Sequence, residues 1–119
     1  MMVTADARIL AEAVLKIAAS WSLADHQTAM ILGLPSQQIV EWRCSPGTSE
    51  ESTEWMRQAK LLLRLHGSLE RLLGAEGGRI EHWLRVPNHD LNGSPLALIV
   101  TNEGLGAVCD YVDGHLFHS

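Results

Sequence analysis

The sequence predicts an all-α fold of six or seven helices joined by short turns, on three observations. Apolar residues recur at helical spacing in two long stretches, residues 5–19 and 54–73. Prolines and glycines divide the rest of the chain into short segments. No segment alternates between apolar and polar residues with the period of two that marks a half-buried strand. The 119 residues, 46% hydrophobic and 19% charged, suit one compact folded unit.

The first predicted helix covers residues 5–19 and carries one apolar face. The residues of that face are Ile9, Leu10, Ala13, Val14 and Ile17. Ser22 has the side chain of a good N-cap and is expected to begin a second helix. Gly33 is expected to end this second helix in the left-handed conformation.

A third, short helix is expected to begin at Pro35 or Ser36. Proline tolerates the first helical turn and serine caps it. The apolar contacts of this helix are expected at Ile39, Val40 and Trp42. Residues 44–52, CSPGTSEES, concentrate helix breakers and cap-forming residues, which predicts a loop.

The longest predicted helix covers residues 54–73 and is rich in leucine. Its leucines occupy more than one helical face: Leu61, Leu62, Leu63, Leu65, Leu69, Leu72 and Leu73. Two explanations stay open. Either the helix is buried on two sides within the monomer, or part of it, or of the first helix, supplies a self-complementary dimer surface.

Glycine and proline mark the ends of the next helices. The segment GAEGG, residues 74–78, ends the long helix. A short helix follows and must stop before Pro87, because proline disfavours the helical conformation in the preceding residue. Ser94 and Pro95 have the pattern of an N-cap and first helical residue for a helix over LALIV.

The last predicted helix begins after Thr101 as its cap and closes at Gly114. Its apolar face is formed by Leu105, Val108, Cys109 and Val112. The remaining residues, 115–119, should project from this helix as a short tail. Its apolar Leu116 and Phe117 are expected either to fold back on the core or to be held for a partner.

Charge and hydropathy argue against several classes of protein. The formal net charge of −5 divides into −1 for residues 1–48 and −4 for residues 49–119, so neither part is a basic platform for nucleic acid. The apolar runs fall far short of the roughly 18 to 20 residues that cross a bilayer, so no membrane span is expected. Asp6, Glu12 and Lys16 are foreign to a secretory signal, which predicts a cytoplasmic protein.

The residues that usually carry catalysis or bind metals form no recognisable constellation. Cys44 and Cys109 match no CxxC or zinc-finger spacing and are expected to be buried as small apolar residues. The six histidines form no zinc ligand set, so no metal site and no cofactor are expected. No glycine-rich phosphate loop follows a strand. We therefore expect a protein that is not an enzyme.

The segment SLADHQTAMILGLPSQQIVEW has the spacing of a helix-turn-helix. Ala29 is small where the two helices cross, Gly33 lies in the turn, and Ile39 anchors the second helix. If the corner reads DNA, the contacts are expected from Gln37 and Gln38 to bases, from Ser36 to a base or phosphate, and from Arg43 to phosphate. Glu41 would repel phosphate and basic residues are few, so a purely structural corner with a polar surface stays an alternative.

The segment WLRVPNHDLNGSPLALIVTNEGLGAVCDYV, residues 83–112, resembles the C-terminal toxin-binding domain of the Xre/MbcA/ParS antitoxins. Those domains combine a short helix with Trp and Leu, a proline–asparagine turn, a short apolar helix and a glycine-marked helix. The matching residues are Trp83, Leu84, Pro87, Asn88, Leu91, Gly93, Pro95, Leu96, Gly104, Val108, Tyr111 and Val112. In this family an Xre-like helix-turn-helix precedes the domain, and residues 23–43 occupy that place here. The resemblance covers roughly residues 8–117.

This resemblance implies a type II antitoxin, usually a homodimer, that neutralises a RES-domain toxin acting on NAD. The antitoxin would occlude the toxin's active site, with the tail DGHLFHS plugging it, and would repress its own operon through DNA binding. The residues expected to bind the toxin are Trp83, Arg85, Asn88, Tyr111, His115, Leu116 and Phe117.

The implied organisation is a helix-turn-helix region in residues 1–48, a connecting helix with a glycine-rich break in residues 49–78, and a toxin-binding domain in residues 79–119. The competing class is a stand-alone helix-turn-helix transcriptional regulator whose rear domain dimerises or senses a ligand.

Overall fold

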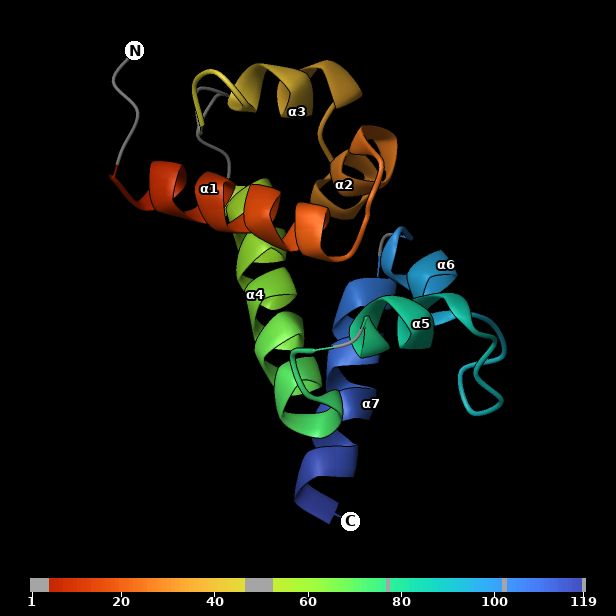
Figure 1. Ribbon diagram of the computed structural model, residues 1–119. Coiled ribbons are helices and arrows are strands. Elements are labelled where there is room, and N and C mark those ends of the chain that lie inside the picture. Colours follow the sequence, from red (N-terminus) through yellow and green to blue (C-terminus); the bar gives the residue numbers. More distant parts are fainter. Residues whose placement is uncertain (1–4, 47–52, 77, 102, 119) are drawn as a thin grey trace.

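A computed structural model gives the fold of residues 5–46, 53–76, 78–101 and 103–118, with the backbone alone for Ala5, Thr53 and 116–118. Over these residues the chain forms seven helices (Figure 1): α1 (Ala5–Ser20), α2 (Asp25–Leu32), α3 (Ser36–Trp42), α4 (Thr53–Leu73), α5 (Arg79–Arg85), α6 (Pro95–Ile99) and α7 (Gly104–His118). Within the same ranges the β structure is limited to an isolated antiparallel bridge between Asn88 and Gly93. The predicted all-α class is confirmed.

Helix α4 is the axis around which the others are arranged. Figure 1 shows α1 crossing its N-terminal half, with α2 and α3 beyond α1 at one end of the molecule. Helix α7 packs along α4, α6 packs against α7, and α5 contacts α6 and α4. The molecule is elongated, with extents of 46 × 27 × 24 Å. The helix-turn-helix segment therefore lies at one end and the end of α7 at the other.

One continuous hydrophobic core joins the front and rear helices. Leu62, Leu65 and Leu69 of α4 are fully buried, and further leucines of this helix are partly buried against the same core. Trp42 and Trp55 pack ring to ring with centroids 4.9 Å apart, which ties the end of α3 to the start of α4. Burial on two sides within the monomer therefore accounts for most of the leucines of α4.

Several helix ends follow the chemistry that the sequence predicts. Gly33 ends α2 with φ of 73°, and its N–H donates to the carbonyls of the last turn. Helix α3 begins at Ser36, directly after Pro35. Pro95 is the first residue of α6, and the Ser94 hydroxyl accepts a hydrogen bond from the N–H of Ala97.

Two predicted caps are wrong. Ser22 does not begin α2: it lies in the α1–α2 turn with φ of 56°, and Ala24 is the N-cap. The side chain of Gln27 accepts from the Ala24 N–H at 2.9 Å and so satisfies this helix end instead. Thr101 does not cap α7, because its hydroxyl donates to the carbonyl of Leu98 at 2.6 Å, at the end of α6.

The predicted end of the last helix is also wrong, because α7 continues through Gly114 to His118. Gly114 is accommodated inside the helix, and the expected projecting tail is a continuation of α7. Ile9, predicted on the apolar face of the first helix, is 61% exposed, because α1 presents only the side around Leu10, Val14 and Ile17 to the core.

Other expectations concern the loop and the membrane. The loop expected at residues 44–52 is described only as far as Pro46, and its remaining residues, with the proposed boundary at residue 48, lie outside the described part of the chain. Among the helices that the structure describes, none is long and apolar enough to span a bilayer.

Candidate functional site

The helix-turn-helix corner is formed by α2, the turn at Gly33–Pro35, and α3. Ala29 and Ile39 are buried where the two helices meet, in the roles that the sequence predicts for them. The side chain of Gln58 in α4 donates to the carbonyl of Ile31 at 3.1 Å and fixes α2 against the long helix. The corner is thus held rigidly on the core.

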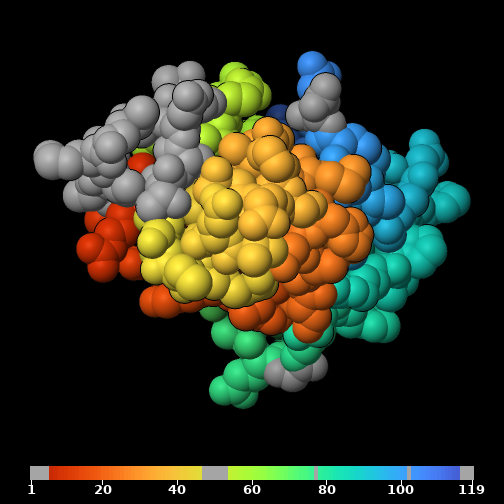
Figure 2. Space-filling model, turned by 90° about the horizontal axis from the view of Figure 1, so that it is seen from above, coloured from red at the N-terminus to blue at the C-terminus, as the bar shows by residue number. Residues whose placement is uncertain are grey.

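The outer face of α3 carries the residues expected to contact bases. Figure 2 shows α3 and α2 covering the face at this end of the molecule. Ser36 and Gln37 are exposed on this helix. Gln38 is half-buried, and its amide donates to the Glu41 carboxylate at 3.5 Å. The geometry therefore leaves two of the three predicted base contacts free to meet a ligand.

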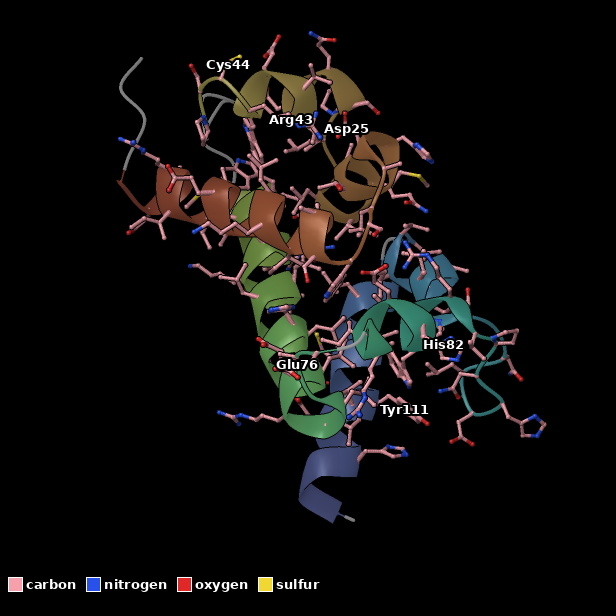
Figure 3. All side chains as sticks on the ribbon, viewed as in Figure 1. Asp25, Arg43, Cys44, Glu76, His82 and Tyr111 are labelled. Carbon is pink, nitrogen blue, oxygen red and sulfur yellow. The ribbon has the colours of Figure 1, made fainter. Side chains whose placement is uncertain are left out.

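Arg43, the predicted phosphate contact, is held by an ion pair within the corner. Its two terminal nitrogens donate to the Asp25 carboxylate at 2.9 and 2.5 Å (Figure 3). The pKa of Asp25 lies below its ordinary value, chiefly because of these hydrogen bonds. Any phosphate would have to compete with this carboxylate for the guanidinium.

The rear candidate residues gather at the turn that precedes α6. The Asn88 side chain accepts hydrogen bonds from the N–H groups of Asp90 and Leu91, which closes an Asx turn. From α7, the Tyr111 hydroxyl donates to the Asp90 carboxylate at 2.9 Å. Asn88 and Tyr111 thus lie in one cluster. Asp90 belongs to the same cluster and was not among the site residues predicted from the sequence.

His115 extends this cluster along α7. Its ring lies 4.4 Å from the ring of Tyr111, centroid to centroid, and its Nδ1 is 3.1 Å from the Tyr111 carbonyl. Loss of water around the Tyr111 hydroxyl raises its pKa, and the neighbouring Asp90 carboxylate adds to the shift while Asn88 opposes it. The hydroxyl is therefore a neutral hydrogen-bond donor at physiological pH.

Arg85 faces the front half of the molecule. Its guanidinium donates to the carbonyls of Trp21 and Ser22 at 2.8 and 3.0 Å, and Ser22 donates to the Glu81 carboxylate. These contacts join α5 to the turn between α1 and α2. Trp83, on the same short helix, is half-buried against the core. The side chains of Leu116 and Phe117 lie outside the described part of the structure.

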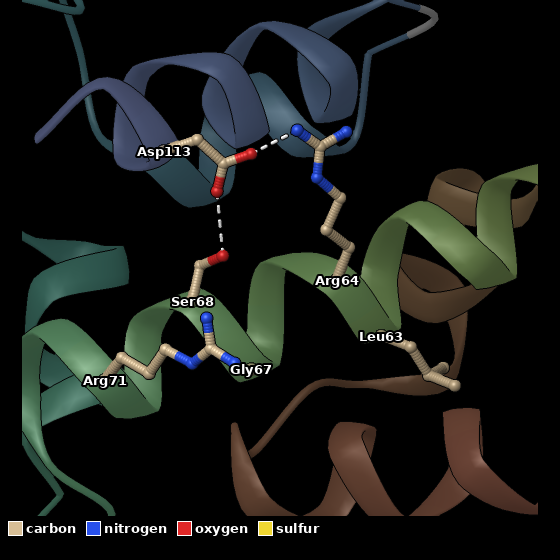
Figure 4. Close-up of a pocket in the computed structure, with 6 residues that line it drawn as sticks. All are labelled: Leu63, Arg64, Gly67, Ser68, Arg71 and Asp113. Carbon is tan, nitrogen blue, oxygen red and sulfur yellow. Dashed lines mark hydrogen bonds and ion pairs between the residues drawn. The ribbon is translucent and has the colours of Figure 1, made fainter. Parts of the chain in front are cut away.

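A second group of polar residues, missed in the sequence, lines a groove between α4 and α7. Arg64 forms an ion pair with Asp113, and the Ser68 hydroxyl donates to the same carboxylate at 2.8 Å (Figure 4). Arg64 and Ser68 lie one turn apart on α4, a spacing that can be seen in the sequence. Their shared partner, Asp113, is more than forty residues away, so the sequence did not indicate the group. The group fastens α7 to α4.

The cysteines have different environments. Cys109 is buried in α7, as predicted, and burial raises its pKa to about 11, so its thiol is protonated at neutral pH. Cys44 is exposed in the turn after α3, so the expectation that it is buried is wrong. Among the described residues, no group of three or more His, Cys, Asp and Glu side chains is arranged to hold a metal ion.

The rear helices thus carry a cluster of polar side chains, and α2 and α3 form a helix-turn-helix corner at the other end of the molecule. Residues 68–115 match the model of a protein family described as the antitoxin Xre/MbcA/ParS C-terminal toxin-binding domain. The matched segment begins inside α4 and includes Trp83, Arg85, Asn88, Tyr111 and His115. A comparison with curated proteins gives no match. The resemblance noted in the sequence is confirmed for this part of the chain and supports an antitoxin role.

Proposed function

We propose that the chain is a type II antitoxin that binds a RES-domain toxin and blocks the toxin's NAD site. The observation that carries the proposal is the match of residues 68–115 to an antitoxin toxin-binding domain. The proposed antitoxin works without a cofactor of its own, is not an enzyme, and acts in the cytoplasm as a homodimer. Neutralisation is then a matter of binding and steric exclusion, not of chemistry.

The rear helices have the rigidity that such binding needs. The Asx turn at Asn88 closes the loop before α6, the Tyr111–Asp90 hydrogen bond joins that loop to α7, and the ion pair between Arg64 and Asp113 joins α4 to α7. Preorganised side chains lose little conformational entropy when a partner binds. The end of α7 extends this rigid surface and, in the proposal, enters the toxin's cleft as a helix.

Co-expression with a RES-domain protein encoded beside this chain's gene tests the proposal. The chain should co-purify with that protein and restore growth to cells that express it. A chain that neither retains the toxin nor rescues growth would contradict the antitoxin assignment.

The proposal includes repression of the antitoxin's own operon through residues 1–48. It is supported by the anchored corner of α2 and α3 and by the exposure of Ser36 and Gln37. The long α4 helix connects this region to the toxin-binding domain. The small number of basic residues predicts weak binding by a monomer, strengthened when two copies bind together.

Substitution of the α3 glutamines tests this second role. Gln37→Ala and Gln38→Ala should weaken binding to the operon's own promoter in a gel-shift series, with the larger effect for the exposed Gln37. A base contact contributes roughly 1–3 kcal/mol. Both variants should still neutralise the toxin. If both bind the promoter as the wild type does, α3 is not the reading helix. Promoter binding by a chain that never retains a toxin would instead favour the stand-alone regulator.

A further inference from the structure

A hollow of about 530 Å³ opens at the junction of α4 and α5. Its walls are Leu73 at the end of α4 and Gly78, Arg79, His82, Trp83 and Val86 on and around α5. Its carbon-rich lining distinguishes it from the groove of Figure 4, where Arg64, Arg71 and Asp113 line the walls.

Arg79 and His82 are the polar side chains in the lining of the hollow, beside apolar Leu73, Trp83 and Val86. The Arg79 guanidinium donates to the carbonyl of Leu73 at 3.2 Å, at the C-terminal end of α4. The guanidinium is therefore already hydrogen-bonded within the chain. Gly78, with φ of 66°, has no side chain to fill the space. Trp83 is half-buried, and Val86 is 41% exposed to solvent.

Trp83 differs from the other tryptophans of the chain. Trp21, Trp42 and Trp55 are fully buried, whereas Trp83 keeps part of its ring accessible in the wall of the hollow. A tryptophan of this kind beside an apolar recess is typical of the anchoring centre of a protein interface. Covering this apolar surface with a partner is favourable by about 25 cal/mol for each Å² removed from water.

We propose that this hollow receives an apolar side chain of the toxin, with Trp83 as its main contact. All six lining residues lie within residues 68–115, the segment matched to a toxin-binding domain, and the inference rests on the proposed antitoxin function. The occupant is a leucine-like or aromatic side chain at the toxin's surface, because the lining offers carbon surface and its arginine is already hydrogen-bonded. This contact is distinct from the cluster around Tyr111 and from the end of α7.

A matched pair of valine substitutions tests the inference. Val86→Arg places a charge in the hollow, whereas Val40→Arg places the same charge on α3, where the valine is 45% exposed and outside the matched segment. Calorimetric titration with the RES-domain protein should show at least about tenfold weaker binding for Val86→Arg. Binding by Val40→Arg should stay within about twofold of the wild type. Circular dichroism melts establish that both variants fold.

The resonance of Trp83 gives a second, independent measurement. When the chain is labelled with 5-fluorotryptophan, the signal of Trp83 in the ¹⁹F spectrum is the one that is absent from the Trp83→Phe variant. Addition of unlabelled toxin should move the Trp83 signal more than the signals of the buried tryptophans. A complex that forms without moving it would overturn the inference, as would a Val86→Arg variant that binds the toxin as tightly as the wild type does.

The remaining outcomes separate this inference from the proposed function. If the wild-type chain fails to bind the toxin, the antitoxin assignment fails and this contact fails with it. If the wild type binds and Val86→Arg binds equally well, only the hollow is wrongly assigned. If Val86→Arg turns a dimer into a monomer in light scattering while toxin binding is unchanged, the occupant is a second copy of the chain and the inference is wrong.

Discussion

At the scale of single residues, the ion pair with Asp25 occupies Arg43, which is the phosphate contact in the proposed DNA-binding role. Asp25→Asn removes one negative charge and frees the Arg43 guanidinium for phosphate, so affinity for the promoter should rise. The plot of log affinity against log salt concentration should become steeper by the amount that about one phosphate contact adds. Fluorescence anisotropy titrations at several salt concentrations measure both effects.

Glu12→Gln is the control for this prediction, because it removes the same charge from an ion pair with Arg8 on α1, outside the helix-turn-helix. It should change affinity by less than Asp25→Asn and leave the salt slope unchanged. Equal effects of the two variants would mean that net charge alone matters and that Arg43 does not reach the backbone of the DNA.

The two thiols give a second prediction at this scale. Cys44 is exposed, whereas Cys109 is buried, with a pKa raised to about 11. Because the thiolate is the reactive form, a disulfide reagent at neutral pH should modify one thiol per native chain and a second only after denaturation. Cys44→Ser should abolish the fast reaction. Rapid modification of both thiols in the native protein would show that the α4–α7 contact opens readily.

The corner between α6 and α7 gives a prediction at the scale of the elements. Gly104, the first residue of α7, is buried, and a Cβ there would lie 1.7 Å from the carbonyl oxygen of Leu98. Gly104→Ala must therefore displace the backbone of α6 and should lower the thermal midpoint by several degrees, since such overpacking costs about 1–3 kcal/mol or more. Thermal melts followed by circular dichroism measure the change.

Gly67→Ala is the matched control, because a Cβ at Gly67, inside α4, meets nothing within 4 Å. Alanine is favoured over glycine in a helix by about 1 kcal/mol, so this variant should be as stable as the wild type or more stable. A Gly104→Ala variant as stable as Gly67→Ala would mean that the α6–α7 corner adjusts without strain.

The limits of most helices could be predicted because the signals are local. The periodicity of α1 and α4, the glycine after α2 and the Ser94–Pro95 pair each act within a few residues. One of the errors arose where distant residues compete with the local signal. Ser22 resembles a cap in sequence, but Arg85 and Glu81, about sixty residues away, bind it in the α1–α2 turn.

At the scale of the whole molecule, the predicted site residues separate into groups. Asn88, Tyr111 and His115 lie together, Trp83 lines the α4–α5 hollow, and Arg85 contacts the front half. The sequence motif indicated which residues belong to the domain. It could not indicate their directions, since these depend on how α5 and α7 pack on α4.

The arrangement of the whole molecule also bears on the proposed role of the end of α7. Figure 1 shows the last part of α7 extending beyond the end of α4. Among the described side chains, buried Val108 and Val112 and the ion pair of Asp113 with Arg64 hold α7 to α4 ahead of Gly114. In the proposed function, the final residues contact the toxin, and we expect their removal to have little effect on the fold.

A chain that ends at Asp113 tests this assignment. It keeps the buried residues of α7 and the ion pair with Arg64, so its thermal midpoint should stay close to that of the full chain. Growth rescue in cells that express the toxin should be lost. Replacing residues 115–118 with alanine keeps the helix length and removes the side chains, so loss of rescue in this variant would assign the effect to side-chain contacts. If the shortened chain melts several degrees lower, the end of α7 belongs to the core; if it is stable and still rescues growth, the toxin is blocked elsewhere on the domain.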